Sequence, residues 1–156
     1  MKPKISTGVL IFKNKKLLLI KHVNPKTGYT WWVPPGGGIK GAESIFEAAL
    51  REVWEETGTK VELDRIVYLR QLIYREQEQN VLTIYLLAKN LKGSFTLDNI
   101  KCHGMDEHYI KEIKFFDKKE IQKINVFPKE LRTILWDDYT ENFPNIKFLG
   151  VELDQG

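Results

Sequence analysis

The sequence predicts one domain, spanning residues 1–156, of the α/β (α+β) class. Two observations predict it. Apolar stretches of strand length alternate with segments of helical periodicity, and one helix between Ser44 and Gly58 carries both a start and a stop signal. A chain of this length can bury a hydrophobic core, and its 42% hydrophobic and 29% charged residues are typical of a globular protein.

Three strands are expected in the first part of the chain. Residues 5–12 and 16–22 are apolar runs on either side of a polar turn. The second run is apolar at successive positions, as in a central strand that is covered on both faces. Residues 31–33 read as a further short strand, and the three glycines at positions 36–38 predict a turn after it.

The helix between Ser44 and Gly58 is the most strongly marked element. Ser44 and Glu47 form a capping box at its start, and Gly58 stands where a left-handed C-terminal cap is wanted. Its apolar residues form two adjacent ridges, which should pack on the rest of the domain. The first ridge is Ile45, Ala49 and Val53, and the second is Phe46, Leu50 and Trp54.

The second half of the chain again alternates strands and helices. Residues 60–68 are extended, residues 69–76 and 80–91 form a hairpin pair, and residues 112–116 are expected to be the last strand. Two helices are expected after it: a short one opened by the capping box of Asp117 and Glu120, and a final one from Pro128 to about Tyr139.

Three glutamates, Glu52, Glu55 and Glu56, fall within an arc of roughly 100° on one helix face, at about 100° per residue. Like charges this close destabilise a bare helix. A divalent cation removes the repulsion, and hard cations such as Mg²⁺ prefer carboxylate oxygens. The alternative is a solvated acidic face on which Arg51 pairs with Glu47 and Glu55. The upstream glycines favour the cation, because glycine lets a backbone approach a ligand closely.

Residues 37–59 resemble the Nudix box, G-x5-E-x7-R-E-U-x-E-E-x-G-U, in which U is a bulky aliphatic residue. The matching positions are Gly37, Glu43, Arg51, Glu52, Val53, Glu55, Glu56 and Gly58. Thr59 departs from the last aliphatic position, and Ala42 replaces the glycine that usually precedes Glu43. The motif is highly specific, and the order of elements around it is compatible with the family's α/β/α sandwich on a mixed β-sheet.

The resemblance implies a reaction and a cofactor. Nudix enzymes hydrolyse a phosphoanhydride bond in a nucleoside diphosphate linked to another moiety, as in a nucleoside triphosphate, a nucleotide sugar or a dinucleoside polyphosphate. The product is a nucleoside monophosphate. The implied cofactor is Mg²⁺ or Mn²⁺, and its implied ligands are Glu52, Glu56, Glu55 and the backbone carbonyl of Gly36.

Other residues are expected to orient the substrate or activate water. Arg51 would orient the glutamates through ion pairs, and Glu43 would either ligate through water or brace the loop. Gly37 and Gly38 would place backbone and helix dipoles near the phosphates. The base is either a box glutamate or an acid from a late loop, and the candidates are Glu52, Glu55, Glu107 and the neighbouring Asp106.

The sequence gives few hints of substrate identity. In several Nudix subfamilies a residue about fifteen positions beyond the box is proline in ADP-ribose enzymes and tyrosine in dinucleoside polyphosphate enzymes. No proline occurs between Pro35 and Pro128, and Tyr74 is near the tyrosine position. Three aromatic residues before the glycines either stack on a base or pack at a strand end: Tyr29, Trp31 and Trp32.

Composition narrows the function classes further. The formal net charge of +3 argues weakly against nucleic acid, which leaves a small nucleotide as the expected partner. The lone Cys102 excludes an intrachain disulfide. No signal segment or run of 18 apolar residues appears, so we expect a cytoplasmic protein without a membrane partner, either monomer or homodimer. Two alternatives stay open: a catalytically weak regulatory module that binds nucleotides, and an RNA 5′-end pyrophosphohydrolase.

Overall fold

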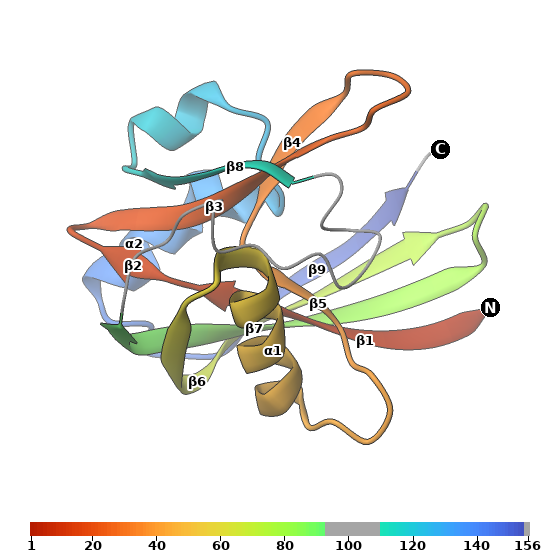
Figure 1. Cartoon of the computed structure of the whole chain (residues 1–156), viewed down its shortest axis with the longest axis horizontal. Helices are drawn as coiled ribbons and strands as arrows, with labels where there is room; N and C mark the ends of the chain where they lie inside the picture. The colour runs from red at the N-terminus through yellow and green to blue at the C-terminus, as the bar shows by residue number, and fades with distance from the viewer. Residues whose placement is uncertain (93–109, 155–156) are drawn as a thin grey trace.

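The computed structural model describes residues 1–92 and 110–154 and has the expected mixed α/β class, with two sheets and helices on opposite sides of them (Figure 1). The elements in chain order are strands β1 (Lys2–Leu10), β2 (Phe12–Lys13), β3 (Lys16–Val23), β4 (Thr30–Val33) and β5 (Gly36–Gly38), helix α1 (Ile45–Thr57), strands β6 (Lys60–Tyr74), β7 (Gln79–Lys92) and β8 (Ile110–Phe116), the 3₁₀ helices η3 (Glu120–Lys123) and η4 (Lys129–Arg132), helix α2 (Ile134–Thr140) and strand β9 (Lys147–Asp154).

The larger sheet has the strand order β5-β1-β7-β6-β9 and is mixed, as expected. β1 pairs with β7 and β6 with β9 in parallel, whereas β1 pairs with β5 and β6 with β7 antiparallel. The expected break near residue 68 is absent, because β6 runs unbroken through that point beside β7. The smaller sheet joins β2, β3 and β4, and β8 pairs with β3.

Helix α1 begins and ends where the sequence indicates. The Ser44 side chain accepts a hydrogen bond from the Glu47 N–H at 3.1 Å, and Gly58 takes a left-handed φ of 67°. Val53 is fully buried with strand residues of β1, β3 and β7, which contributes roughly 1.5–3 kcal/mol. The expectation that the second apolar ridge is packed was wrong, since Phe46 and Leu50 are 40% and 41% exposed. The helix turns its acidic residues inward instead.

The three glycines form strand β5, and not the turn that their composition predicts. Gly36, Gly37 and Gly38 pair with β1 across from Gly8, Thr7 and Ser6. A Cβ at Gly36 would lie 2.0 Å from the Thr7 carbonyl oxygen. Glycine is therefore required here because two backbones approach too closely for any side chain.

The C-terminal third differs most from expectation. β8 is not the last strand, because β9 follows and adds a parallel edge to β6. The expected final helix is divided into η4 and α2 at Thr133, whose φ of −121° and ψ of −93° are not helical. The division lets Leu131 and Leu135 both be fully buried in the core cluster that also contains Tyr68. None of the described helices is long and apolar enough to cross a membrane.

Candidate active site

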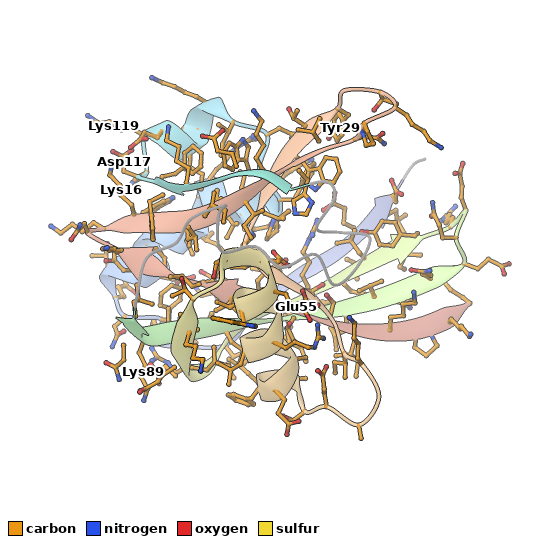
Figure 2. The ribbon with its side chains drawn as sticks, in the orientation of Figure 1. Lys16, Tyr29, Glu55, Lys89, Asp117 and Lys119 are labelled. Atoms are coloured by element: carbon orange, nitrogen blue, oxygen red, sulfur yellow. The ribbon has the colours of Figure 1, made fainter. Side chains whose placement is uncertain are left out.

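The acidic residues of α1 lie on its inner side. Glu55 and Glu56 are only 8% and 5% exposed, and Glu52 is half-buried. Figure 2 labels Glu55 on the helix where α1 faces the strands. Buried carboxylates are costly unless they are paired or bind a cation. The helix therefore places charge where burial of apolar side chains would be the ordinary choice.

Strand β5 supplies the surface that these glutamates meet. The Gly36 N–H donates a hydrogen bond to Glu56 Oε1 at 3.3 Å. A Cβ at Gly37 would lie 2.4 Å from Glu52 Oε1, so the missing side chain leaves the space that the carboxylate occupies. The Gly37 carbonyl accepts a hydrogen bond from the Thr7 hydroxyl at 3.2 Å, which ties β5 to β1. The structure thus brings the glycines and the box glutamates together.

Arg51 joins the box residues to one another. Its Nε lies 2.6 Å from Glu43 Oε1, and its Nη1 lies 2.9 Å from Glu52 Oε1 and 3.1 Å from Glu55 Oε2. Its Nη2 also donates to the Gly38 carbonyl at 3.0 Å. The expected i,i+4 pair with Glu55 is present, and Glu43 and Glu52 are the other ion-pair partners of Arg51, in place of the expected Glu47. Arg51 orients one oxygen of each of two inner glutamates.

The electrostatics of this cluster are unbalanced. The hydrogen bond from Arg51 lowers the pKa of Glu43 to about 2. Desolvation by burial raises the pKa of Glu52, and the nearby Glu55 charge adds to the rise. Among the described residues, the guanidinium of Arg51 contacts the carboxylates of Glu43, Glu52 and Glu55, and Lys40 adds a weaker attraction at Glu43. Glu56 brings a fourth carboxylate to the same cluster, so carboxylates outnumber these two cations. The cluster would be more stable with an added cation.

The donor chemistry fits a hard divalent cation. The box offers carboxylate oxygens and backbone carbonyls, which are the ligands that Mg²⁺ and Mn²⁺ prefer. Over residues 1–92 and 110–154, no three His, Cys, Asp or Glu side chains already converge as a ready ligand set. Arg51 contacts one oxygen of Glu52 and one of Glu55, which leaves the second oxygen of each carboxylate for a cation.

A cavity of about 1080 Å³ opens between the two sheets. This volume is slightly above the range of about 300–1,000 Å³ that is typical of small-molecule sites. Its wall contains strand residues from β4, β6 and β9 and the segment that leads into η4. The lining residues are Asn24, Tyr29, Trp31, Val33, Arg70, Leu72, Tyr74, Gln77, Phe127, Lys129, Glu152, Leu153 and Asp154.

The cavity borders a smaller hollow beside strand β5. This hollow, of about 160 Å³, is lined by Gly36, Gly37 and Val33, and Val33 also lines the large cavity. The two hollows therefore meet at Val33, at the end of β4 just before β5.

Aromatic residues on β4 divide between the cavity and the core. Trp31 stacks with Tyr29 at 5.6 Å between ring centroids, and both line the cavity. Trp32 is only 8% exposed and packs edge-on against Phe116 at 4.7 Å, so it lies in the core. Side chains alternate along a strand, which is why neighbours point to opposite faces. Trp31 therefore faces the cavity, whereas Trp32, the tryptophan expected to contact a substrate, faces the core.

A family model decides the assignment. The model of the NUDIX domain matches residues 2–136. The chain belongs to the Nudix hydrolase family. Strand β9 lies beyond the matched residues.

Individual relatives agree with this assignment. This Nudix hydrolase is 25% identical over 136 residues to the phosphatase NudJ of Escherichia coli K12, covering 69% of this chain and 88% of NudJ. Its fold resembles a NUDIX hydrolase from Nitrosomonas europaea (TM-score 0.71, 19% identity, 99% of this chain and 81% of that one). It also resembles an ADP-ribose pyrophosphatase from Streptococcus suis (TM-score 0.61, 21% identity, 98% and 100%).

Sequence reasoning did not find the far wall of the cavity in this Nudix hydrolase. Arg70, Glu152 and Asp154 meet there only because β9 pairs with β6. No motif links residues that lie some eighty positions apart. Tyr74 lines the same cavity and is half-buried, and desolvation by burial raises the pKa of its hydroxyl. Asp106 and Glu107 lie outside the described residues.

Proposed function

We propose that this Nudix hydrolase cleaves a phosphoanhydride bond in a nucleoside diphosphate linked to another moiety and releases a nucleoside monophosphate. The observation that carries the proposal is the cluster of inward-facing box glutamates. It has more negative than positive charge, and β5, which contacts it, also lines a hollow that borders, at Val33, a cavity large enough for a nucleoside. A diphosphate that arrives with a divalent cation would complete that charge balance.

The cation in this proposal is Mg²⁺ or Mn²⁺. Glu52, Glu55 and Glu56 would hold it together with the backbone carbonyl of Gly36. When bound, it supplies charge neutralisation of the diphosphate and a lower pKa for a bound water. Gly38 leaves room for the phosphates beside β5, since a Cβ there would have no atom nearer than the Ile5 carbonyl oxygen at 3.9 Å, whereas the space at Gly37 holds the Glu52 carboxylate.

Arg51 acts as a positioning residue in this proposal. Its contacts with Glu52, Glu55 and the Gly38 carbonyl fix the acids against β5, and Glu43 fixes the arginine from the other side. A base must still take the proton of the attacking water. Glu52 suits that role because burial raises the pKa of its carboxyl. Glu55 and Glu107 are the other candidates, the latter by sequence position.

The cavity would hold the nucleoside. Trp31 and Tyr29 offer aromatic faces for a base, and Tyr74 offers a ring and a hydroxyl. The names of two relatives, an ADP-ribose pyrophosphatase and a UDP-X diphosphatase, both describe diphosphates that join a nucleoside to a second group. We propose substrates of the same general kind for this enzyme.

A nucleotide panel tests the proposal. The purified protein is incubated with Mg²⁺ and with nucleoside triphosphates, nucleotide sugars, ADP-ribose and dinucleoside polyphosphates, and products are separated by ion-exchange chromatography. We expect a nucleoside monophosphate from at least one substrate, and loss of turnover in excess chelator. Glu47→Gln is the matched control for a substitution at a box glutamate such as Glu56→Gln, because Glu47 is exposed on the same helix. Full turnover in chelator would overturn the metal assignment.

The same panel separates the alternatives. A regulatory module would bind a nucleotide without turnover in any metal. An RNA 5′-end enzyme would process a 5′-triphosphorylated RNA faster than every small nucleotide in the panel. Either result would replace the proposed reaction.

A further inference from the structure

An arginine at the far wall of the cavity is neutralised by the C-terminal strand. Arg70 of β6 is only 7% exposed and lines the cavity. Its Nη2 donates directly to the Glu152 carboxylate of β9, which is itself part of the wall. Glu152 follows the end of the family-matched residues by sixteen positions. The ion pair thus joins β6 to the C-terminal strand β9, which lies beyond the matched residues.

A second carboxylate lies at the same wall. Asp154 lines the cavity and stands opposite Tyr74 in the pairing of β9 with β6. The charged residues of the lining are thus Arg70 and Lys129 against Glu152 and Asp154. Arg70 is engaged with Glu152 and with the Tyr85 hydroxyl, so on the β6–β9 side of the cavity the carboxylates outnumber the available cationic donors, while Lys129 adds a cation from η4.

Arginine in a nucleotide site commonly binds phosphate, because its planar fork matches phosphate oxygens. A phosphate that takes the Nη2 donor now bonded to Glu152 would have to displace that carboxylate, and it would lie near the carboxylates of Glu152 and Asp154. Uncharged ribose hydroxyls or an amino group could instead donate to the same oxygens without loss of the ion pair. This wall should therefore favour uncharged hydrogen-bond donors over a phosphate group.

We propose that Glu152 of β9 sets substrate specificity by masking Arg70, so that the cavity accepts a nucleoside and rejects one with an additional phosphate on its ribose. The inference rests on the proposed function only in placing a nucleoside in this cavity. Glu152 is a positioning residue in this account, since it acts through the arginine.

Binding measurements test the inference without turnover. The probes are adenosine 5′-monophosphate, adenosine 2′,5′-bisphosphate and adenosine 3′,5′-bisphosphate, titrated by calorimetry in chelator so that only the cavity and its surroundings are measured. We expect the wild-type protein to bind the monophosphate at least about tenfold more tightly than either bisphosphate. Glu152→Gln removes the carboxylate charge and keeps the side-chain shape. The ratio of monophosphate affinity to bisphosphate affinity should then fall by about tenfold or more for at least one bisphosphate.

Two further variants show whether the effect passes through Arg70. The double variant Arg70→Gln/Glu152→Gln should lose the gain in bisphosphate affinity, because the unmasked guanidinium is gone. Glu62→Gln, on the same strand as Arg70 but outside the cavity lining, is the matched control and should leave the ratio unchanged. A purely structural role for Glu152 would change all three affinities alike and would leave their ratio constant.

Each outcome is decisive. The inference would be overturned if the wild-type protein bound the monophosphate and the bisphosphates equally well, or bound none of the three nucleotides. It would also be overturned if Glu152→Gln left the affinity ratio unchanged, or if the gain in bisphosphate affinity persisted in the double variant. The proposed function is judged separately by turnover. A changed ratio with no hydrolysis of any diphosphate would retain the masking role and reject the reaction, whereas hydrolysis with an unchanged ratio would do the reverse.

Discussion

Two buried charged clusters in this protein differ in how their charges are balanced. In the cluster at α1, the guanidinium of Arg51 contacts three carboxylates, and Glu56 lies beside them. The second cluster surrounds Asp138 of α2, which is 2% exposed. Its carboxylate accepts hydrogen bonds from the Tyr68 hydroxyl at 2.6 Å and from the Lys147 ammonium.

The two clusters differ in whether their charges are balanced within the chain. The Asp138 cluster joins α2, β6 and β9 with one negative and one positive charge, so it is complete without a ligand. The box cluster carries an excess of negative charge in a region of low exposure, which raises the pKa of Glu52. A buried group that lacks balance within the chain is expected to gain it from a ligand. Substitutions in the two clusters should therefore have opposite consequences.

The largest effect is expected from Glu56→Gln, which removes one box charge and keeps the side-chain shape. Turnover should fall on the order of 100-fold or more, beyond the 10–100-fold typical of residues that only support a metal ligand. The midpoint of thermal unfolding should stay the same or rise slightly, because like-charge repulsion is relieved. Steady-state kinetics and thermal unfolding, with Glu47→Gln as control, measure both. Turnover equal to wild type would show that Glu56 has no part in the site.

Arg51→Lys tests positioning in the same cluster. Lysine keeps the charge but cannot make the forked contacts to Glu43, Glu52 and Glu55 together. Mn²⁺ affinity, followed by the electron paramagnetic resonance signal of the free ion, should fall by about 10–100-fold. Unchanged affinity would mean that the glutamates hold their places without the arginine.

Asp138→Ala should show the reverse behaviour. The change leaves the buried Tyr68 hydroxyl without its Asp138 acceptor. The free energy of unfolding in urea should therefore fall by about 1–3 kcal/mol. Activity at 25 °C should remain, because Asp138 lies outside the cavity lining. Asp137→Ala, at the exposed neighbouring position of α2, is the matched control. A loss of turnover without a loss of stability would contradict the division between the clusters.

The smallest effect is expected at Asp117, a carboxylate near the surface and far from Glu55 in Figure 2. It caps η3 by accepting from the Glu120 N–H at 2.8 Å, and this bond lowers its pKa below the ordinary 3.8. A lowered folded pKa stabilises the protein above the unfolded pKa, and the contribution is lost as pH falls through the folded pKa. Asp117→Ala should therefore lower the thermal midpoint at pH 7.

The pH dependence provides the check on Asp117. The difference between Asp117→Ala and wild type should shrink as pH is lowered below about 4. A constant difference from pH 7 down to pH 2 would show that the cap does not depend on the carboxylate charge.

Local signals determined the box helix. Ser44, Gly58 and the spacing of the glutamates act within one or two helical turns, so sequence alone predicted where α1 begins, where it ends and which residues share its acidic face. The family assignment followed from the same spacing and was confirmed by the domain match.

Only the tertiary structure decided the rest. Gly36 and Gly37 form a strand because they pair with β1. They are glycine because β1 and the Glu52 carboxylate lie too close for side chains. Which of two adjacent tryptophans faces the cavity depends on the register of β4 with β3. Arg70 meets Glu152 because β9 returns to the edge of β6, a pairing that has no local signature. Short-range signals fix elements, whereas contacts between distant segments depend on how those elements pack, and it is that packing that made the cavity.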